Sequence, residues 1–239
     1  MLKQTWSQPA IDSLTLSGSE LYEKTHRQYL GTGIRPLDLL LSGGIPRGHI
    51  TQIVGPSSSG KTSLLFSILA QATARGEWVA YIDPFSSLDP AFAQKAGIDL
   101  KYLLWIRGPK RVFKAIDILV GAGGFGVVVL DLVTQGKTMN PRILQRTPFT
   151  VWFRLKRAAR RTSTALLILG QAVNAGSAVS RVISLKRRET QWSSTTDKTS
   201  SRDTEPRHAR LLRGICSELE LLRGKDAHAH ATFYCHFQL

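Results

Sequence analysis

Two patterns of hydrophobic and polar positions alternate between residues 49 and 169. Short apolar runs predict strands at His49–Val54, Trp78–Ile82, Leu103–Ile106, Gly126–Leu132 and Ala165–Leu169. Helical spacing occupies the stretches between them, at Lys61–Ala74, Pro90–Ala96, Val112–Val120 and Pro148–Arg161. Strands that alternate with helices predict an α/β fold, with a mostly parallel central sheet and helices on both faces.

The two ends of the chain do not show this alternation of apolar runs and helical spacing. A short helix around Ser19–Tyr29 is one interpretation of the polar N-terminal segment, and Arg35–Leu41 predicts one or two helical turns. Near the C-terminus, Cys216–Leu222 and Ala231–Leu239 alternate, which predicts a hairpin that completes the sheet. We therefore divide the chain into an N-terminal segment (1–30), an α/β core (31–185), a basic, Ser/Thr-rich flexible loop (186–210) and the hairpin (211–239).

A glycine-flanked loop joins the first predicted strand to the first long helix. It reads Gly55-Pro56-Ser57-Ser58-Ser59-Gly60-Lys61-Thr62 and matches the G-x-x-x-x-G-K-[ST] pattern at every fixed position. The glycines let backbone N–H groups turn inward around phosphates, and the helix that begins near Lys61 adds its positive end. Lys61 neutralises the β- and γ-phosphates, and the Thr62 hydroxyl ligates Mg²⁺. The loop and the adjoining Ser63 therefore predict binding of ATP with magnesium.

An aspartate closes the apolar run at Val127–Leu130. In proteins with such a phosphate loop, a carboxylate in this position holds Mg²⁺ through water, which is the role we predict for Asp131. The alternative is that Asp131 caps a following helix.

The charge of the chain is strongly unbalanced. Its 239 residues hold 32 Lys+Arg against 17 Asp+Glu, a net charge of +15, and the surplus is denser after residue 150. Such a surplus favours a polyanionic partner, either nucleic acid or an anionic membrane surface, although an inert basic surface is the alternative. No apolar run approaches the length of a bilayer span, so we expect a cytoplasmic protein that does not contact a membrane.

The two cysteines of the chain fit a reducing compartment. They are Cys216 and Cys235, and they would face each other if the hairpin turned between Lys225 and Asp226.

Two basic stretches could contact a polyanionic partner. Arg154, Arg157 and Arg161 share one face of a predicted helix, which would contact either DNA or a protein. A second group precedes Trp192, and cations beside an aromatic ring suit single-stranded DNA. Its members are Arg181, Lys186, Arg187 and Arg188, which follow a small, uncharged stretch that begins at Asn174.

Several segments, in order, resemble the core of RecA-type recombinases over about residues 30–185. They are Thr32–Asp38, Gly44–Gly48, Gly55–Ser63, Tyr81–Pro90, Gly97–Asp99 and Leu166–Gln171. The resemblance implies that Asp89 contacts the adenine amino group and that Phe92 stacks on the adenine ring. It also implies that Gln171 senses the γ-phosphate, and that the loop Ala172–Val182 lies where RecA has a DNA-binding loop.

One departure from the RecA pattern concerns catalysis. The RecA glutamate that activates the attacking water corresponds to Phe85, whose ring can neither accept a proton nor orient water. Asp83 lies two residues earlier and is a candidate substitute, although it is shorter and displaced along the strand. We therefore expect ATP binding with slow or absent hydrolysis.

Three functions follow from this sequence. The form of the chain is most similar to RecA paralogues of the ImuA group, which implies an adaptor for a DNA-repair polymerase in damage tolerance. An active DNA-dependent ATPase or recombinase that uses Asp83 as its base is the second interpretation, and a homo-oligomer is possible. A small-molecule P-loop kinase is the third, but the segment after Ile82 resembles RecA instead.

Overall fold

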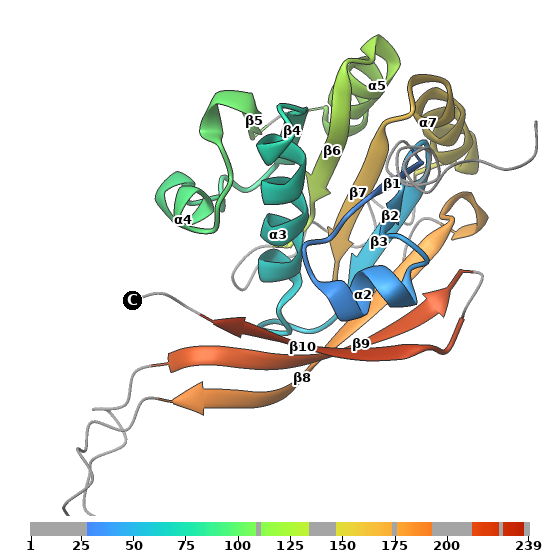
Figure 1. The fold of residues 1–239 in the computed structure, drawn as a ribbon. Helices are drawn as coiled ribbons and strands as arrows, with labels where there is room; N and C mark the ends of the chain where they lie inside the picture. Colours follow the sequence, from blue (N-terminus) through green and yellow to red (C-terminus); the bar gives the residue numbers. More distant parts are fainter. Residues whose placement is uncertain are drawn as a thin grey trace, which may run out of the picture.

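The structure is a computed structural model that describes residues 28–108, 111–133, 147–173, 176–192, 212–224 and 227–236. Within these ranges, eight strands form one sheet in the order β10-β9-β8-β3-β7-β6-β4-β5 (Figure 1). A separate two-stranded ribbon pairs β1 (Tyr29–Leu30) with β2 (Ile45–Pro46). The α/β fold with a mostly parallel sheet is therefore confirmed.

The parallel part of the sheet contains the five predicted strands. They are β3 (Ile50–Val54), β4 (Trp78–Asp83), β5 (Leu103–Arg107), β6 (Phe125–Asp131) and β7 (Ala165–Gly170). Strand β7 pairs with β3 on one side and β6 on the other, so it lies in the middle of the sheet. All six of its residues are buried, which explains why its sequence is continuously apolar rather than alternating.

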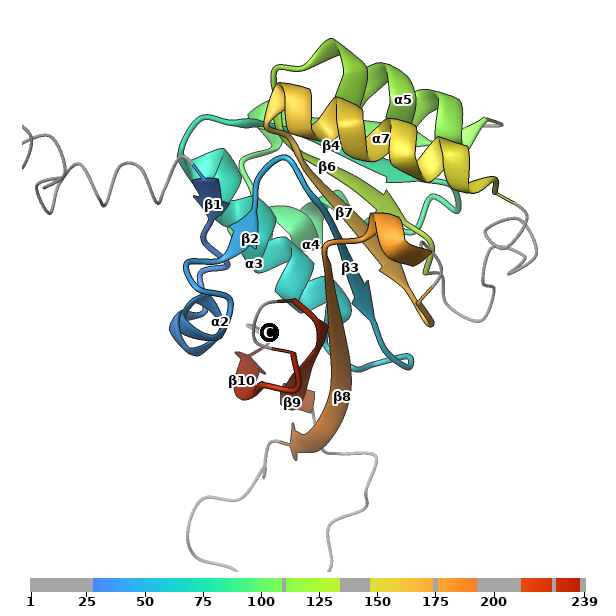
Figure 2. The ribbon, with the colours of Figure 1, turned by 90° about the vertical axis from the view of Figure 1, so that its right-hand side faces the viewer.

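Helices cover both faces of the sheet (Figure 2). The short α2 (Arg35–Leu40), the long α3 (Lys61–Ala74) and α4 (Pro90–Lys95) lie on one face, and α5 (Val112–Ala122) and α7 (Phe149–Thr162) pack together on the other. Alternate residues of β6 point to the two faces, so Val127 and Val129 join the core under α3 whereas Val128 and Leu130 join the core under α5 and α7.

The C-terminal part of the sheet is antiparallel, as predicted. Strand β8 (Arg181–Trp192) pairs in parallel with β3, and then β9 (Leu212–Arg223) and β10 (His230–His236) add antiparallel neighbours. Residues 186–192 were expected to begin a flexible loop, but they form the second half of β8 because they pair with β9. The rest of that expected loop, and the expected helix before residue 28, lie outside the described residues.

The hairpin register does not place the two cysteines opposite each other, as a turn between Lys225 and Asp226 would have done. Cys216 stands opposite Tyr234, and Cys235 stands opposite Ile215, so the two cysteines point to opposite faces of the sheet. Both are free thiols. The register of the hairpin is offset by one residue from the one that we expected, and this offset alone separates the two side chains.

The carboxyl ends of β3, β4, β6 and β7 meet at one edge of the sheet because these strands are parallel. In open α/β sheets, ligands bind outside this edge. No helix among the described residues is long and apolar enough to span a membrane.

Candidate nucleotide-binding site

The loop between β3 and α3 is packed tightly against the C-terminal hairpin. Gly55 has φ 152° and Gly60 has φ 87°, conformations that side chains oppose. A Cβ at Gly55 would lie 2.3 Å from the carbonyl oxygen of Leu185 in β8, and one at Gly60 would lie 2.5 Å from Oγ of Ser217 in β9. Both glycines therefore allow the loop to approach β8 and β9 closely, in addition to allowing its backbone angles. Sequence reasoning missed this support of the loop by the hairpin.

The Lys61 ammonium group is folded back onto this loop. Its Nζ donates to the carbonyl oxygen of Gly55 at 2.7 Å, to that of Pro56 and, at 3.4 Å, to Oγ of Ser59. Burial lowers the pKa of Lys61 below its ordinary value, whereas the nearby Asp131 acts in the opposite direction. These acceptors are neutral oxygens, so phosphate oxygens would be stronger partners for the same cation.

Asp131 ends β6 at the predicted position, and both of its oxygens are hydrogen-bonded. Oδ2 accepts from the Tyr81 hydroxyl at 2.5 Å, and Oδ1 accepts from the backbone N–H of Val133 at 2.9 Å. Burial raises the pKa of Asp131, although these hydrogen bonds and Lys61 oppose the rise. Burial also raises the pKa of Tyr81 well above its ordinary value, with Asp131 adding to the effect, so Tyr81 is the donor. Sequence reasoning did not single out Tyr81, because a tyrosine in a buried strand is usually a packing residue.

The loop and Asp131 enclose a hollow of about 390 Å³. Its lining comprises residues 57–63 together with Phe66, Tyr81, Ser87, Leu88, Asp131, Val133 and Ile215. Thr62 and Asp131 thus present a hydroxyl and a carboxylate to the same space, and oxygen donors are the ligands that Mg²⁺ prefers. The residues present therefore fit a magnesium–phosphate group. Asp131 is the one carboxylate in this lining, taken over the described residues.

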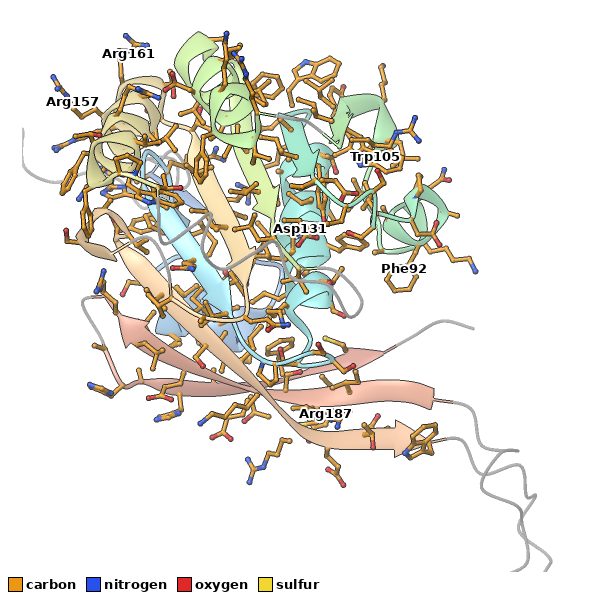
Figure 3. All side chains as sticks on the ribbon, turned by 180° about the vertical axis from the view of Figure 1, so that it is seen from behind. Phe92, Trp105, Asp131, Arg157, Arg161 and Arg187 are labelled. Carbon is orange, nitrogen blue, oxygen red and sulfur yellow. The ribbon has the colours of Figure 1, made fainter. Side chains whose placement is uncertain are left out.

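Phe92 and Asp89 lie beyond the phosphate hollow. A second hollow of about 410 Å³ shares Ser63 and Phe66 with the first and is lined by Phe92. Figure 3 shows Phe92 pointing outward from α4. The centroid of its ring lies 5.9 Å from that of Phe66. The Asp89 carboxylate caps α4 by accepting from the N–H groups of Ala91 and Phe92, at 2.9 and 3.3 Å. A base-binding role for Phe92 and Asp89 stays a prediction.

Asp83 does not line the phosphate hollow and is fully buried. Its Oδ1 accepts from the Phe85 N–H at 3.3 Å and from the Ser87 hydroxyl at 3.2 Å. Its Oδ2 accepts from the Leu88 N–H at 2.9 Å and from the Trp105 indole at 3.2 Å. Burial acts to raise the pKa of Asp83, but the hydrogen bonds outweigh it and lower the pKa below its ordinary value. A carboxylate engaged in this way braces the loop after β4 and is a poor proton acceptor.

Gln171 follows β7 directly and is exposed. It lies at the same edge of the sheet as Asp131 but not in the lining of the phosphate hollow. The neighbouring Ala172 is anchored, because its carbonyl oxygen accepts from Nε2 of Gln52 at 3.0 Å. The proposed sensing of phosphate by Gln171 stays a prediction.

The predicted DNA-contacting residues divide into two kinds. Arg181 is tied into the fold, since its Nη1 donates to the carbonyl oxygen of Leu41 at 2.7 Å and its guanidinium lies 5.8 Å from the Tyr29 ring centroid. Lys186, Arg187 and Arg188 are exposed on β8, and Figure 3 labels Arg187 beside the C-terminal hairpin. Asn174 lies outside the described residues.

The basic helix α7 presents a second exposed surface. Trp152, Leu155 and Ala159 are buried against the sheet. Arg157 and Arg161 point outward from the opposite face (Figure 3). Arg154 is partly neutralised, since its Nε donates to Oδ1 of Asp117 at 2.9 Å.

Comparisons with known proteins agree with this geometry. A family model described as the RecA N-terminal domain matches residues 10–146. Protein RecA of Methylococcus capsulatus is 43% identical over 106 residues, which cover 43% of this chain and 30% of the relative. Protein RecA of Deinococcus radiodurans is 43% identical over 119 residues, which cover 48% of this chain and 32% of the relative. The chain thus spans about a third of the length of these relatives.

A solved structure of the RadB recombinase is similar in fold. It superposes with a TM-score of 0.60 and covers 85% of this chain and 94% of its own. The sequence identity is 20%, so the likeness concerns the fold alone.

Proposed function

The chain belongs to the RecA N-terminal domain family, and from this premise we propose that it binds ATP with Mg²⁺ in the hollow between the phosphate loop and Asp131. Residues 55–63 would surround the phosphates, with Lys61 exchanging its carbonyl partners for phosphate oxygens. Thr62 and Asp131 would hold the metal, which supplies positive charge to the phosphates when it is bound. The observation that carries the proposal is the convergence of Lys61, Thr62 and Asp131 on one hollow.

Hydrolysis by this site is slow or absent in our proposal. Phe85 stands where the resemblance requires a glutamate, and Asp83 is engaged by four hydrogen bonds and does not line the hollow. The remaining carboxylate of the described lining, Asp131, is the metal-holding group. Loss of a general base typically lowers a rate about a hundredfold or more.

An ATP-binding protein that turns over slowly suits a regulatory role better than a motor. We therefore propose an adaptor in DNA repair and damage tolerance, similar to the ImuA group of RecA paralogues. A repair polymerase or single-stranded DNA would be its partner. The RecA family also implies association of the chain with further copies of itself. Exposed Lys186, Arg187 and Arg188 support a nucleic-acid contact along β8, and the basic face of α7 offers another surface.

Turnover measurements test the hydrolysis proposal. Phosphate release from ATP should stay near background with and without single-stranded DNA, and Asp83→Ala protein that remains folded should not change the result. Turnover comparable to that of an active recombinase would replace the adaptor by the DNA-dependent ATPase.

A pull-down from DNA-damaged cells tests the partner. The native chain should recover polymerase subunits, and Lys61→Ala should recover fewer if nucleotide occupancy sets the binding shape. Recovery of metabolic enzymes without polymerase subunits would contradict the repair assignment.

A further inference from the structure

Tyr81 is placed by the sheet itself to reach Asp131. Strands β4 and β6 are parallel neighbours, and Tyr81 stands beside Val129 in their register. Asp131 follows Val129 by two residues, so it lies on the same face of the sheet. The Tyr81 ring therefore extends toward the carboxyl end of β6, where its hydroxyl lies 2.5 Å from Oδ2 of Asp131.

Packing explains the ring of Tyr81 but not its hydroxyl. The residue is 1% exposed and belongs to the apolar core that contains Val129 and Leu167. Phenylalanine would fill that core without adding a polar atom, and a buried hydroxyl costs free energy unless it is hydrogen-bonded. The hydroxyl donates to the carboxylate at the phosphate hollow, which Tyr81 also lines.

The hydrogen bonds to Asp131 fix the direction of its carboxylate. Val133 donates to Oδ1 and Tyr81 donates to Oδ2, so rotation of the carboxylate would break both bonds. Each carboxylate oxygen has two lone pairs, so each keeps one for a water molecule or an ion. Outer hydrogen-bond partners of this kind orient metal-binding side chains and contribute to metal affinity.

We propose that Tyr81 is a positioning residue for magnesium, because its hydroxyl holds the Asp131 carboxylate in the orientation that receives the Mg²⁺ of the nucleotide complex. The inference rests on the proposed binding of ATP at this site and specifies how the chain recognises the metal. Tyr81 acts through Asp131.

The test measures ATP affinity by calorimetry as a function of Mg²⁺ concentration and again in EDTA. Tyr81→Phe should bind ATP in EDTA within about twofold of the native chain, because the phosphate loop is unchanged. The Mg²⁺ concentration at which the affinity for ATP is increased half-maximally should rise about 10- to 100-fold. Tyr102→Phe is the matched control, since its ring packs against Trp78, away from the hollow, and it should behave as the native chain.

A double-mutant cycle separates positioning from a general structural effect. Asp131→Asn alone should weaken the dependence of ATP affinity on Mg²⁺. Adding Tyr81→Phe to the Asp131→Asn variant should cause no further change in that dependence. An unchanged Mg²⁺ response in Tyr81→Phe would overturn the inference. So would an equal loss of affinity with and without Mg²⁺, which would indicate damage to the loop. Failure of the native chain to bind ATP in either condition would overturn the proposed function itself, and this inference with it.

Discussion

Replacing Asp83 by asparagine separates a structural role from a catalytic one. Asparagine keeps the size of the side chain, but one of its terminal atoms becomes an N–H₂ donor. If the N–H₂ group takes the place of Oδ2, the bonds from Leu88 and Trp105 are lost. In the other orientation the bond from the Phe85 N–H is lost, and the Ser87 hydroxyl, which can also accept, keeps its contact. The bonds that remain are no longer charge-assisted.

The cost follows from these four hydrogen bonds. A hydrogen bond to a charged group contributes roughly 1.5–3 kcal/mol, so losing one bond, together with the charge assistance of the others, should destabilise the fold by at least about 2 kcal/mol. That is a large fraction of the roughly 5–15 kcal/mol of a typical domain. Urea denaturation followed by tryptophan fluorescence measures it, with Asp99→Asn as a control because Asp99 makes an exposed cap to the Lys101 N–H.

The pH dependence supplies an independent check. The pKa of Asp83 is lowered in the folded chain, because the hydrogen bonds outweigh burial, so its stabilisation is complete above the unfolded pKa, near about 3.9. It is lost as the pH falls through the lower folded pKa. The stability gap between the native chain and Asp83→Asn should therefore be full at neutral pH and narrow below about pH 4. The structural account is refuted if the variant loses measurable ATP turnover while its stability is unchanged.

Three further changes probe the site and its surface. Lys61→Met should weaken ATP binding by about 10- to 100-fold, since charge-assisted contacts to phosphate are lost, and a fluorescent-nucleotide titration would show it. Gly55→Ala should destabilise the fold by about 1–3 kcal/mol and weaken ATP binding, because the new Cβ meets the Leu185 carbonyl, and denaturation with the same titration would reveal both. Charge reversal of Arg187 and Arg188 should weaken single-stranded DNA binding and flatten its salt dependence without affecting ATP, as measured by fluorescence anisotropy over a salt series.

The central part of the fold was predictable from local pattern. A continuous apolar run such as Ala165–Leu169 is consistent with a strand buried on both faces, and the periodic stretch after Gly60 has the length of the α3 helix. The phosphate loop and Asp131 were predictable for the same reason, since the loop follows β3 directly and Asp131 is the last residue of β6. Their meeting at one edge is a consequence of parallel strands.

Contacts between distant segments were not predictable. The packing of Gly60 against Ser217 joins residues far apart in sequence, and the hydrogen bond from Tyr81 to Asp131 depends on the register of two strands. Register also determined the faces of the sheet to which the two cysteines point, since a shift of one residue moves a side chain to the other face. Asp83 was a candidate base by position alone, and only the four donors around it identify its bracing role.

Calorimetry of ATP binding in the presence of Mg²⁺ tests the central claim most directly. The native chain should release or absorb heat with a one-site isotherm, and Lys61→Ala protein with an unchanged circular dichroism spectrum should lose most of that affinity. Absence of any association of ATP or ADP with the folded native chain would contradict the assignment of this hollow to a nucleotide.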